Sequence, residues 1–507
     1  MAILFVEVAV LGAVCRVDRA AAREPDRPPN VLILCADDHA AYVTGAYGNE
    51  LVRTPNIDLL AAGGLRFERA YCNAPVCTAS RQSLLTGRYP RSIGVTLLRT
   101  PLPDAEVTLA ETYKLAGFDT AAIGKMHFNS NLAHGFDLRV DAREHRQWLR
   151  GQTVPPIPRG VEVQPPWRPF RDPARVWLNS ACRPIELPEA QSDGVYFADQ
   201  AAQFLQAPRA KPFFLFVSFY QPHAPYRFPL EYRGKYDPAE FDVPEPGPED
   251  DDQIPEIFRE LTREEKQGIN AAYYTSVEYM DACVGRVLDA LDDAGLADDT
   301  LVIYFGDHGY MLGQHGRFEK HCSYEEAVRV PLVMRWPKRI AAGRRTRAFV
   351  ELVDLAPTIH ELCGYQVTPP LQGRSLVPLI DAQTTKHRDH VIVEYAQNDE
   401  IMIRDNDWKL VYERGKRRRD DGYDTGRPLV PDQFRLYDMY ADRREMRNVV
   451  DDPANAATVK RLTDLLVEHL AVTSREPKLV PPITDPMALL DYCVQPHDVE
   501  PPDKRRP

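Results

Sequence analysis

The chain has 507 residues, with 62 Lys and Arg against 74 Asp and Glu, which gives a formal net charge of −12 at pH 7. This length predicts two or three domains, or one large core with a smaller companion. The acidic balance argues against a nucleic-acid partner, because nucleic-acid binders present a basic surface to phosphate. The 44% of apolar residues excludes a disordered or fibrous chain. Nine cysteines are too few for a disulfide framework, and no Cys-x-x-Cys pair indicates a zinc or redox motif.

Residues 1–29 form an N-terminal apolar segment. From Met1 to Val14 the segment is apolar apart from Glu7, and small residues follow at positions 20–22. This pattern resembles a signal peptide, although no Lys or Arg precedes the apolar run. We therefore expect a periplasmic or secreted protein, with a cytoplasmic protein as the alternative. No stretch approaches the roughly 18 apolar residues of a membrane span, so no stable membrane insertion is expected.

Four apolar runs, each followed at once by polar residues, predict the strands of a central parallel sheet. Continuous apolar runs without alternation are typical of strands that are buried on both faces. Helices are predicted between them, because capping patterns at Thr54-Pro55, Thr108–Glu111 and Thr262–Glu265 precede amphipathic stretches. The four runs are residues 31–36, 120–123, 213–219 and 301–305.

This alternation of strands and helices predicts an α/β fold, in which helices sandwich a large doubly wound mixed sheet. Ligands of such sheets bind at the carboxyl ends of the strands, where all four polar clusters fall. The pattern changes near residue 389, after which strands at 391–395, 408–412 and 434–437 and a helix at 457–472 predict a smaller α+β subdomain. We therefore divide the chain into a catalytic domain, residues 30–388, and a C-terminal subdomain, residues 389–507.

Two of the polar clusters offer metal ligands. Asp37-Asp38 follows the first run and Asp307-His308 follows the last one. Adjacent buried carboxylates repel each other unless they are neutralised, and a divalent cation is the simplest neutraliser. Three oxygen donors favour calcium or magnesium over zinc. Either pair alone is explained as a helix cap or turn, but two pairs after two apolar strands favour the metal.

Cys77 is a candidate for an activated thiol. A helix is predicted to begin just after Cys77 and to end at Gly87, which places the thiol at the helix N-terminus. The helix dipole favours negative charge there, and Arg81 lies one turn further on. The alternative is that Cys77 is a small buried hydrophobic residue, as most single cysteines are.

Short motifs that recur in a fixed order extend this interpretation. Cys77-x-Ala79-x-Arg81 is followed by Leu84-Leu85-Thr86-Gly87-Arg88. Over residues 30–450 the set resembles the formylglycine sulfatases of the alkaline phosphatase superfamily, including iduronate-2-sulfatase-like and other bacterial glycan-acting members. The further motifs are Thr54-Pro55-Asn56-Ile57-Asp58, Gly124-Lys125-Met126-His127, Pro222-His223-Ala224-Pro225-Tyr226, Gly306-Asp307-His308-Gly309 and His315-Gly316 to Lys320.

The resemblance implies a modified nucleophile and a metal ion. Cys77 would be converted to formylglycine by a formylglycine-generating maturase, and the aldehyde would hydrate to a gem-diol. Ala79 stands where many eukaryotic members have Pro, a replacement that bacterial maturation systems accept. The ion would be Ca²⁺, with Mg²⁺ as the alternative. Its ligands would be Asp37, Asp38, Asp307, His308 and the modified Cys77.

The resemblance also assigns roles to the other polar residues. Arg81 and Lys125 would orient the formylglycine and the sulfate, and His127 would help to deprotonate the gem-diol. His223 and Lys320 would contact the sulfate and protonate the departing oxygen. Attack on a sulfate ester needs its oxygens neutralised by cations, which agrees with these roles. One gem-diol oxygen attacks sulfur and the second hydroxyl expels sulfate, so an unmodified thiol would be nearly inactive.

We therefore predict a sulfatase, a sulfuric ester hydrolase, that acts on a sulfated saccharide. Trp148, Trp167 and Trp177 suit sugar stacking, although tryptophans in loops are more often packing anchors. A small aryl or choline sulfate is the alternative substrate. A formylglycine phosphonate or phosphodiester hydrolase would use nearly the same site. The non-enzyme alternative, an inactive sulfated-glycan binder, would lack a ligand or the nucleophile, and none is missing here.

Overall fold

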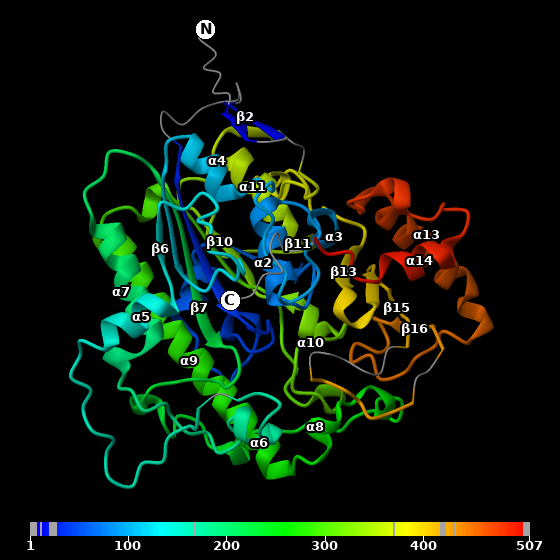
Figure 1. Ribbon diagram of the computed structural model, residues 1–507, viewed down its shortest axis with the longest axis horizontal. Helices are drawn as coiled ribbons and strands as arrows, with labels where there is room; N and C mark the ends of the chain where they lie inside the picture. Colours follow the sequence, from blue (N-terminus) through cyan, green and yellow to red (C-terminus); the bar gives the residue numbers. More distant parts are fainter. Residues whose placement is uncertain are drawn as a thin grey trace, which may run out of the picture.

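A large mixed sheet crosses the centre of the molecule (Figure 1). The computed structural model describes residues 8–10, 13–19, 28–166, 168–368, 371–415, 422–428 and 431–499. The strand order is β11-β4-β10-β8-β3-β7-β5-β6, and β9 pairs with β4. The strands are β3 (Asn30–Asp37), β4 (Leu65–Tyr71), β5 (Asp119–Gly124), β6 (Leu138–Val140), β7 (Phe213–Pro222), β8 (Thr300–Gly306), β9 (Arg329–Val330), β10 (Leu332–Arg335) and β11 (Arg344–Glu351).

The four strands predicted from apolar runs lie next to one another in the order β8-β3-β7-β5. They pair in parallel, as predicted, so their carboxyl ends meet at one edge of the sheet. The antiparallel strand β10 separates β8 from β4 and makes the sheet mixed.

Over the central strands, each face of the sheet is covered by helices and forms its own hydrophobic core. Along β3, Leu32 and Leu34 point into one core, while Ile33 and Cys35 point into the other. This alternation explains why the strand is apolar at every position. The first core includes α1 (Pro55–Ala62), α7 (Asp193–Gln206) and α9 (Arg263–Asp293), and the second includes α2 (Cys77–Thr86), α4 (Leu109–Leu115) and α11 (Leu355–Leu362).

The predicted helix starts are confirmed. Pro55 is the first residue of α1, and Thr108 with Glu111 forms a capping box at α4. Thr262 forms the same box with Glu265 and begins the 31-residue helix α9. Shorter helices lie in the connections: α3 (Pro90–Ile93), α5 (Ala142–Leu149), α6 (Ala174–Trp177), α8 (Glu256–Arg259), α10 (Glu325–Val328) and α12 (Val377–Ile380).

A smaller antiparallel sheet lies beside the large one, as predicted (Figure 1). It contains one strand that the sequence did not predict, β14, and the predicted helix α13 packs on it. The boundary proposed at residue 388 stays a prediction. The elements are β13 (Val391–Tyr395), β14 (Glu400–Arg404), β15 (Trp408–Glu413), β16 (Gln433–Asp438), α13 (Ala456–Thr473) and α14 (Pro486–Cys493).

A third sheet joins β1 (Val8–Val10), β2 (Ala13–Arg19) and β12 (Tyr365–Thr368). Much of the expected leader, including residues 1–7 and 20–27, lies outside the described residues. Within the described ranges, no helix combines the length and apolar character needed to span a membrane.

Candidate metal centre and active site

The carboxyl ends of β3 and β8 bring the two predicted ligand pairs together. The strands pair with Ala36 opposite Gly306, so Asp37-Asp38 and Asp307-His308 emerge at the same level. The chain turns at Asp38, whose φ of 66° lies in the left-handed region that Asp tolerates better than most residues. The register of β3 against β8 therefore determines where these two ligand pairs lie.

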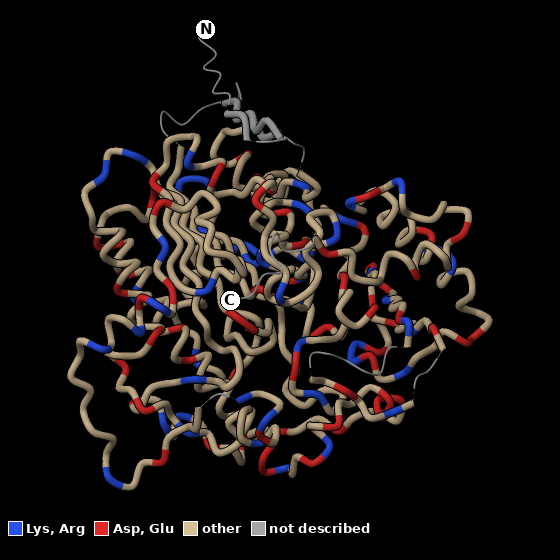
Figure 2. Tube along the Cα trace, viewed as in Figure 1, with Lys and Arg blue, Asp and Glu red and all other residues tan. Residues whose placement is uncertain are grey.

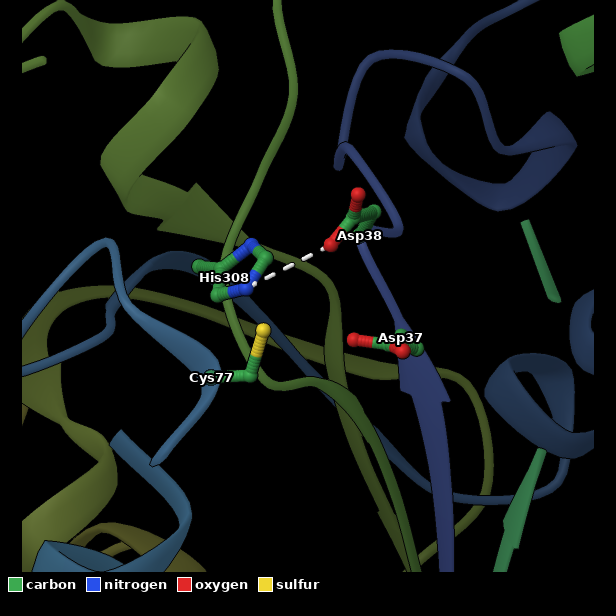
Figure 3. Close-up of side chains that lie close together, drawn as sticks. All are labelled: Asp37, Asp38, Cys77 and His308. Carbon is green, nitrogen blue, oxygen red and sulfur yellow. Dashed lines mark ion pairs between the residues drawn. The ribbon is translucent and has the colours of Figure 1, made fainter. Parts of the chain in front are cut away.

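Asp37, Asp38, Cys77 and His308 each direct one ligand atom toward a common space (Figure 3). These four atoms lie within 4.8 Å of one another, and all four side chains are buried. His308 Nδ1 lies 3.0 Å from the carbonyl oxygen of Gly309. A hydrogen bond to that carbonyl places the proton on Nδ1 and leaves the Nε2 lone pair facing the group, as in metal-binding imidazoles.

Two atoms of this group support metal binding. His308 Nε2 and Asp37 Oδ1 are buried and have no hydrogen-bond partner among the described residues. Both atoms have only longer ion-pair contacts: Asp37 Oδ1 lies 3.7 Å from Arg81 Nη2, and His308 Nε2 lies 3.4 Å from Asp38 Oδ1. A buried polar atom without a hydrogen bond is costly, and a cation in the common space would satisfy both atoms. The residues present therefore fit a divalent metal ion.

Asp307 lies at the edge of this group. Its Oδ1 accepts hydrogen bonds from the backbone amides of Asp38, at 3.1 Å, and of His308, at 3.0 Å. Its Oδ2 accepts one from Arg81 Nε at 2.7 Å. Oδ1 also lies 3.5 Å from His308 Nε2. Asp307 thus ties the two strand ends together, and its predicted role as a ligand stays a prediction.

Buried cations surround the carboxylates. Lys320 Nζ lies 2.6 Å from Asp38 Oδ1 and 3.4 Å from Cys77 Sγ. Lys125 Nζ donates to Asp37 Oδ2. Because each carboxylate is paired, the cluster avoids the cost of isolated buried charges. The structure thus brings both predicted lysines to the centre.

Arg81 connects three strands of the sheet, β5, β7 and β8, through one guanidinium group. Besides Asp307 at the end of β8, its Nη1 donates to the carbonyl oxygen of Lys125, after β5, at 2.7 Å. The same atom donates to Ser218 Oγ, on β7, at 2.7 Å. Ser218 was not predicted, because one serine within an apolar run carries no signal of what lies beside it.

Cys77 is the first residue of α2, one position earlier than predicted. All ten residues of this helix are buried. Ser80 Oγ donates to the carbonyl oxygen of Asp307 at 2.5 Å, which holds the helix start against the sheet edge. Although burial opposes ionisation, Lys125 and Lys320 hold the pKa of the Cys77 thiol well below its usual range. The arrangement supports an anionic group at this position.

Nearby charges also shift the pKa values of His308 and Asp37. Burial favours neutral His308, yet the Asp307 carboxylate outweighs it and raises the pKa of His308 to about 9 in the metal-free protein. Burial also disfavours ionised Asp37, but Lys125 holds the pKa of that carboxyl below its usual range. Opposite charges at short distance therefore outweigh desolvation at His308 and Asp37, whereas burial prevails at Asp307 and raises the pKa of its carboxyl.

Both predicted histidines lie near the nucleophile or its carboxylates. His127 contributes, after the two lysines and His308, to the lowered pKa of the Cys77 thiol. The carbonyl oxygen of His127 accepts a hydrogen bond from Gln82 Nε2 at 3.1 Å, which fixes the loop to α2. His223 is half-buried, and its charge acts on Asp37. All the predicted catalytic residues thus gather at this sheet edge.

Other residues considered from the sequence have structural roles. His315 Nδ1 lies 2.8 Å from Asp250 Oδ1, and its ring stacks on Tyr324. Trp177 is buried in the first core, and Trp148 packs against Tyr196, so both serve as packing anchors. Trp167 lies outside the described residues.

A cavity of about 370 Å³ includes His127 in its lining and so adjoins the catalytic centre on the side of the loop after β5. Tyr220, which sequence reasoning missed, lines it and lies with its ring centroid 6.0 Å from Lys125 Nζ. Most of the other lining side chains are polar or aromatic. They include His127, Phe128, Asn129, Ser130, Asn131, Arg139 and Asp141.

The mixed sheet, with a cation-lined site at its carboxyl edge, is the architecture of the alkaline-phosphatase-like hydrolases. A family model described as Sulfatase matches residues 29–365, and one described as N-sulphoglucosamine sulphohydrolase, C-terminal, matches residues 313–471. The chain therefore belongs to the sulfatase family and is a sulfuric ester hydrolase.

Individual relatives agree with this assignment. Human iduronate 2-sulfatase is 31% identical over 425 residues, which cover 73% of this chain and 74% of that protein. A phosphonate monoester hydrolase of Agrobacterium radiobacter has a similar fold, with a TM-score of 0.74 at 24% identity over 88% of this chain and 96% of that one. A structure in complex with its substrate D-glucosamine-2-N,6-O-disulfate has a TM-score of 0.70 at 24% identity, over 89% and 99% of the chains. At these identities the two structures show the fold alone.

Replacing Arg81 tests its role as an anchor. In Arg81→Met, Asp307 Oδ2 and Ser218 lose a buried donor, and we expect the free energy of unfolding to fall by about 3 kcal/mol or more. Urea denaturation followed by circular dichroism measures this change. Arg168→Met, which breaks an exposed pair with Asp172, is the control and should cost less than about 1 kcal/mol. Equal effects of the two substitutions would contradict the anchoring role.

Proposed function

We propose that this sulfatase hydrolyses a sulfate ester of a saccharide, with Cys77 in its formylglycine form as the nucleophile and Ca²⁺ as the bound ion. One observation carries the proposal: Cys77 Sγ, at the first residue of α2, lies 3.4 Å from Lys320 Nζ and within 4.8 Å of ligand atoms of Asp37, Asp38 and His308. A reacting group at Cys77 therefore stands between metal ligands and a cation.

The burial of Cys77 bears on when it is modified. The residue is 1% exposed, and the helix that it begins is buried throughout. A maturase has no access to this side chain in the folded protein. Conversion to formylglycine by such an enzyme therefore has to precede folding of this region.

The residues around Cys77 divide the work of ester hydrolysis. A hydrated formylglycine at position 77 would supply one hydroxyl group as the nucleophile toward sulfur and a second whose deprotonation would release sulfate and restore the aldehyde. Lys125 and Lys320 face the same space and bind sulfate oxygens. His127, beside residue 77, accepts the proton of the attacking hydroxyl group. His223 and Lys320 supply a proton to the departing alcohol oxygen.

The donor set favours Ca²⁺. Asp37 and Asp38 offer hard carboxylate oxygens, and Asp307 Oδ1 lies 3.5 Å from His308 Nε2, at the border of the group. Oxygen-rich sets suit calcium or magnesium, and calcium tolerates irregular geometry better. The bound ion would contribute positive charge to the sulfate group.

The cavity that includes His127 in its lining supports a saccharide as substrate. Its volume, about 370 Å³, falls within the range of about 300–1,000 Å³ of small-molecule sites. Tyr220 offers an aromatic surface, and Asn129 and Asn131 offer amides for sugar hydroxyls. The human relative is named for iduronate, and the ligand of the disulfate complex is a glucosamine derivative. Both are saccharides.

Peptide mass spectrometry tests the nucleophile. Trypsin cleaves after Arg69 and Arg81, so one peptide, Ala70–Arg81, carries both Cys72 and Cys77. After alkylation of protein from a host with a maturase, we expect an alkylated thiol at Cys72 and an unalkylated carbonyl at Cys77. Cys72 is thus an internal control. Alkylated thiols at both positions in active enzyme would refute the formylglycine mechanism.

Thermal unfolding tests the ion. Because a ligand bound only to the folded state stabilises it, Ca²⁺ added to chelator-treated protein should raise the midpoint by a few degrees. Mg²⁺ should raise it less. Asp38→Asn and His308→Ala should abolish the shift, whereas the exposed substitution Asp451→Asn should keep it. A shift that survives both centre substitutions would place the ion elsewhere.

Steady-state kinetics test the substrate class. We expect kcat/KM to be highest for a sulfated monosaccharide, lower for aryl, choline and methyl sulfates, and lowest for a phosphonate monoester. Faster cleavage of the phosphonate would favour the alternative hydrolase, and faster cleavage of choline or aryl sulfate would favour a small substrate.

The substitution Tyr220→Ala tests, by the same steady-state kinetics, whether the cavity binds the saccharide. Loss of stacking should raise KM for the sulfated monosaccharide about fivefold, with little change for methyl sulfate, which is too small to fill the cavity. Tyr440→Ala, at a residue that is 81% exposed, is the matched control.

A further inference from the structure

A second cavity, of about 350 Å³, is lined by five arginines and one glutamate. It lies on strands β4, β9 and β11, none of which carries a residue of the catalytic centre. We call it the arginine cavity. Its lining residues are Arg66, Glu68, Arg69, Arg329, Arg345 and Arg347.

Strand register places two of these cations directly opposite each other. In the parallel pair of β4 and β11, Arg345 is the partner of Arg66. On β4, Leu65 and Phe67 are fully buried, whereas Arg66 and Glu68 are half-buried. The cavity therefore lies on the outer face of these strands. Like charges opposite each other destabilise a sheet unless other charges compensate them.

Acidic side chains among the described residues do not pair with every arginine of the cavity. Arg66 is paired with Glu68 at 2.6 Å, and Arg69 Nη1 donates to the neutral Asn406 Oδ1, at 2.5 Å. Among the described residues, no ion pair or hydrogen bond engages the side chains of three lining residues. These are Arg329, Arg345 and Arg347.

The surrounding charges make the cavity electropositive. Burial and the nearby cations Arg404 and Arg347 lower the pKa of Arg69, so a further positive charge is disfavoured there. The charge of Arg329 acts on Glu325, but that carboxylate already accepts from Tyr71 at 2.9 Å and pairs with Arg404. Because Glu325 is already paired, it compensates little of the positive charge of the arginine cavity.

We propose that the arginine cavity is an exosite that binds a sulfate group of a sulfated saccharide chain, away from the sulfate ester that is cleaved. The proposal rests on the proposed function for its choice of a saccharide. Guanidinium groups bind tetrahedral oxyanions through paired N–H donors. Because the whole chain carries a net charge of −12, a polyanion is repelled on average, and a local basic site is needed to capture it.

Equilibrium binding of a defined probe tests this exosite. The probe is a fluorescently labelled, multiply sulfated hexasaccharide, titrated into full-length Cys77→Ala protein so that no sulfate is removed. Arg345→Ser/Arg347→Ser, at two exposed positions, should weaken binding roughly tenfold and make it less sensitive to salt. Arg443→Ser/Arg444→Ser removes two other exposed arginines, changes the net charge equally and should weaken binding less than about twofold.

Further probes identify the anion. The unsulfated hexasaccharide should not bind through the cavity, and a polyphosphate of matched charge should bind more weakly than the sulfated probe. Equal losses in the two double variants would overturn the exosite. Tighter arginine-dependent binding of polyphosphate would overturn the assignment to a saccharide.

Turnover measurements distinguish a failure of the exosite proposal from a failure of the proposed function. In the enzyme with native Cys77, Arg345→Ser/Arg347→Ser should leave kcat/KM for a sulfated monosaccharide unchanged, because that substrate occupies only the catalytic centre. If sulfate esters are cleaved and the double substitution does not weaken hexasaccharide binding, the exosite is refuted and the proposed function stands. If the arginines bind the probe but no sulfate ester is cleaved, the proposed function is refuted and the anion site stands.

Discussion

The in-register parallel pairing of β3 with β8 is the constraint on which the rest of the site depends. It sets Asp37-Asp38 level with Asp307-His308 and lets the amide of Asp38 donate to Asp307 Oδ1 at 3.1 Å. A slip by one residue would turn every side chain of the strand to the opposite face. Leu32 and Leu34 would then leave their core, so hydrophobic packing on both faces of the sheet fixes the position of the charged residues.

The buried carboxylates explain where the cations lie. Placing an ion in a protein interior costs several kcal/mol, and the cost is offset only by close opposite charges with good geometry. Lys125 and Arg81 meet this need for Asp37 and Asp307, and each comes from a different element. The buried charges of the centre are therefore paired with one another, and Arg81 links α2 to the sheet edge.

The sequence predicted the centre of the sheet better than its periphery. Strands β3, β5, β7 and β8 are continuous apolar runs, but on β4 the residues Arg66, Glu68 and Arg69 interrupt the apolar pattern because one face is solvated. Within the site, the sequence motifs were enough to predict that Cys77 lies close to the aspartates, lysines and histidines of the centre. The motifs gave no signal for Tyr220, whose position near Lys125 and in the cavity lining depends on how β7 ends and on the loop after β5.

The catalytic centre and the arginine cavity use cations in different ways. Acidic and basic positions are interspersed over most of the described trace, so neither site follows from the overall charge (Figure 2). An ammonium group has three donors; Lys320 directs one at Asp38 Oδ1 and one at Cys77 Sγ, which leaves one for a further acceptor beside Cys77. Lys320 is thus positioned by a carboxylate before substrate arrives. Arg345 and Arg347 have no such partner among the described residues, so a bound anion would supply the compensation that the protein itself supplies in the catalytic centre.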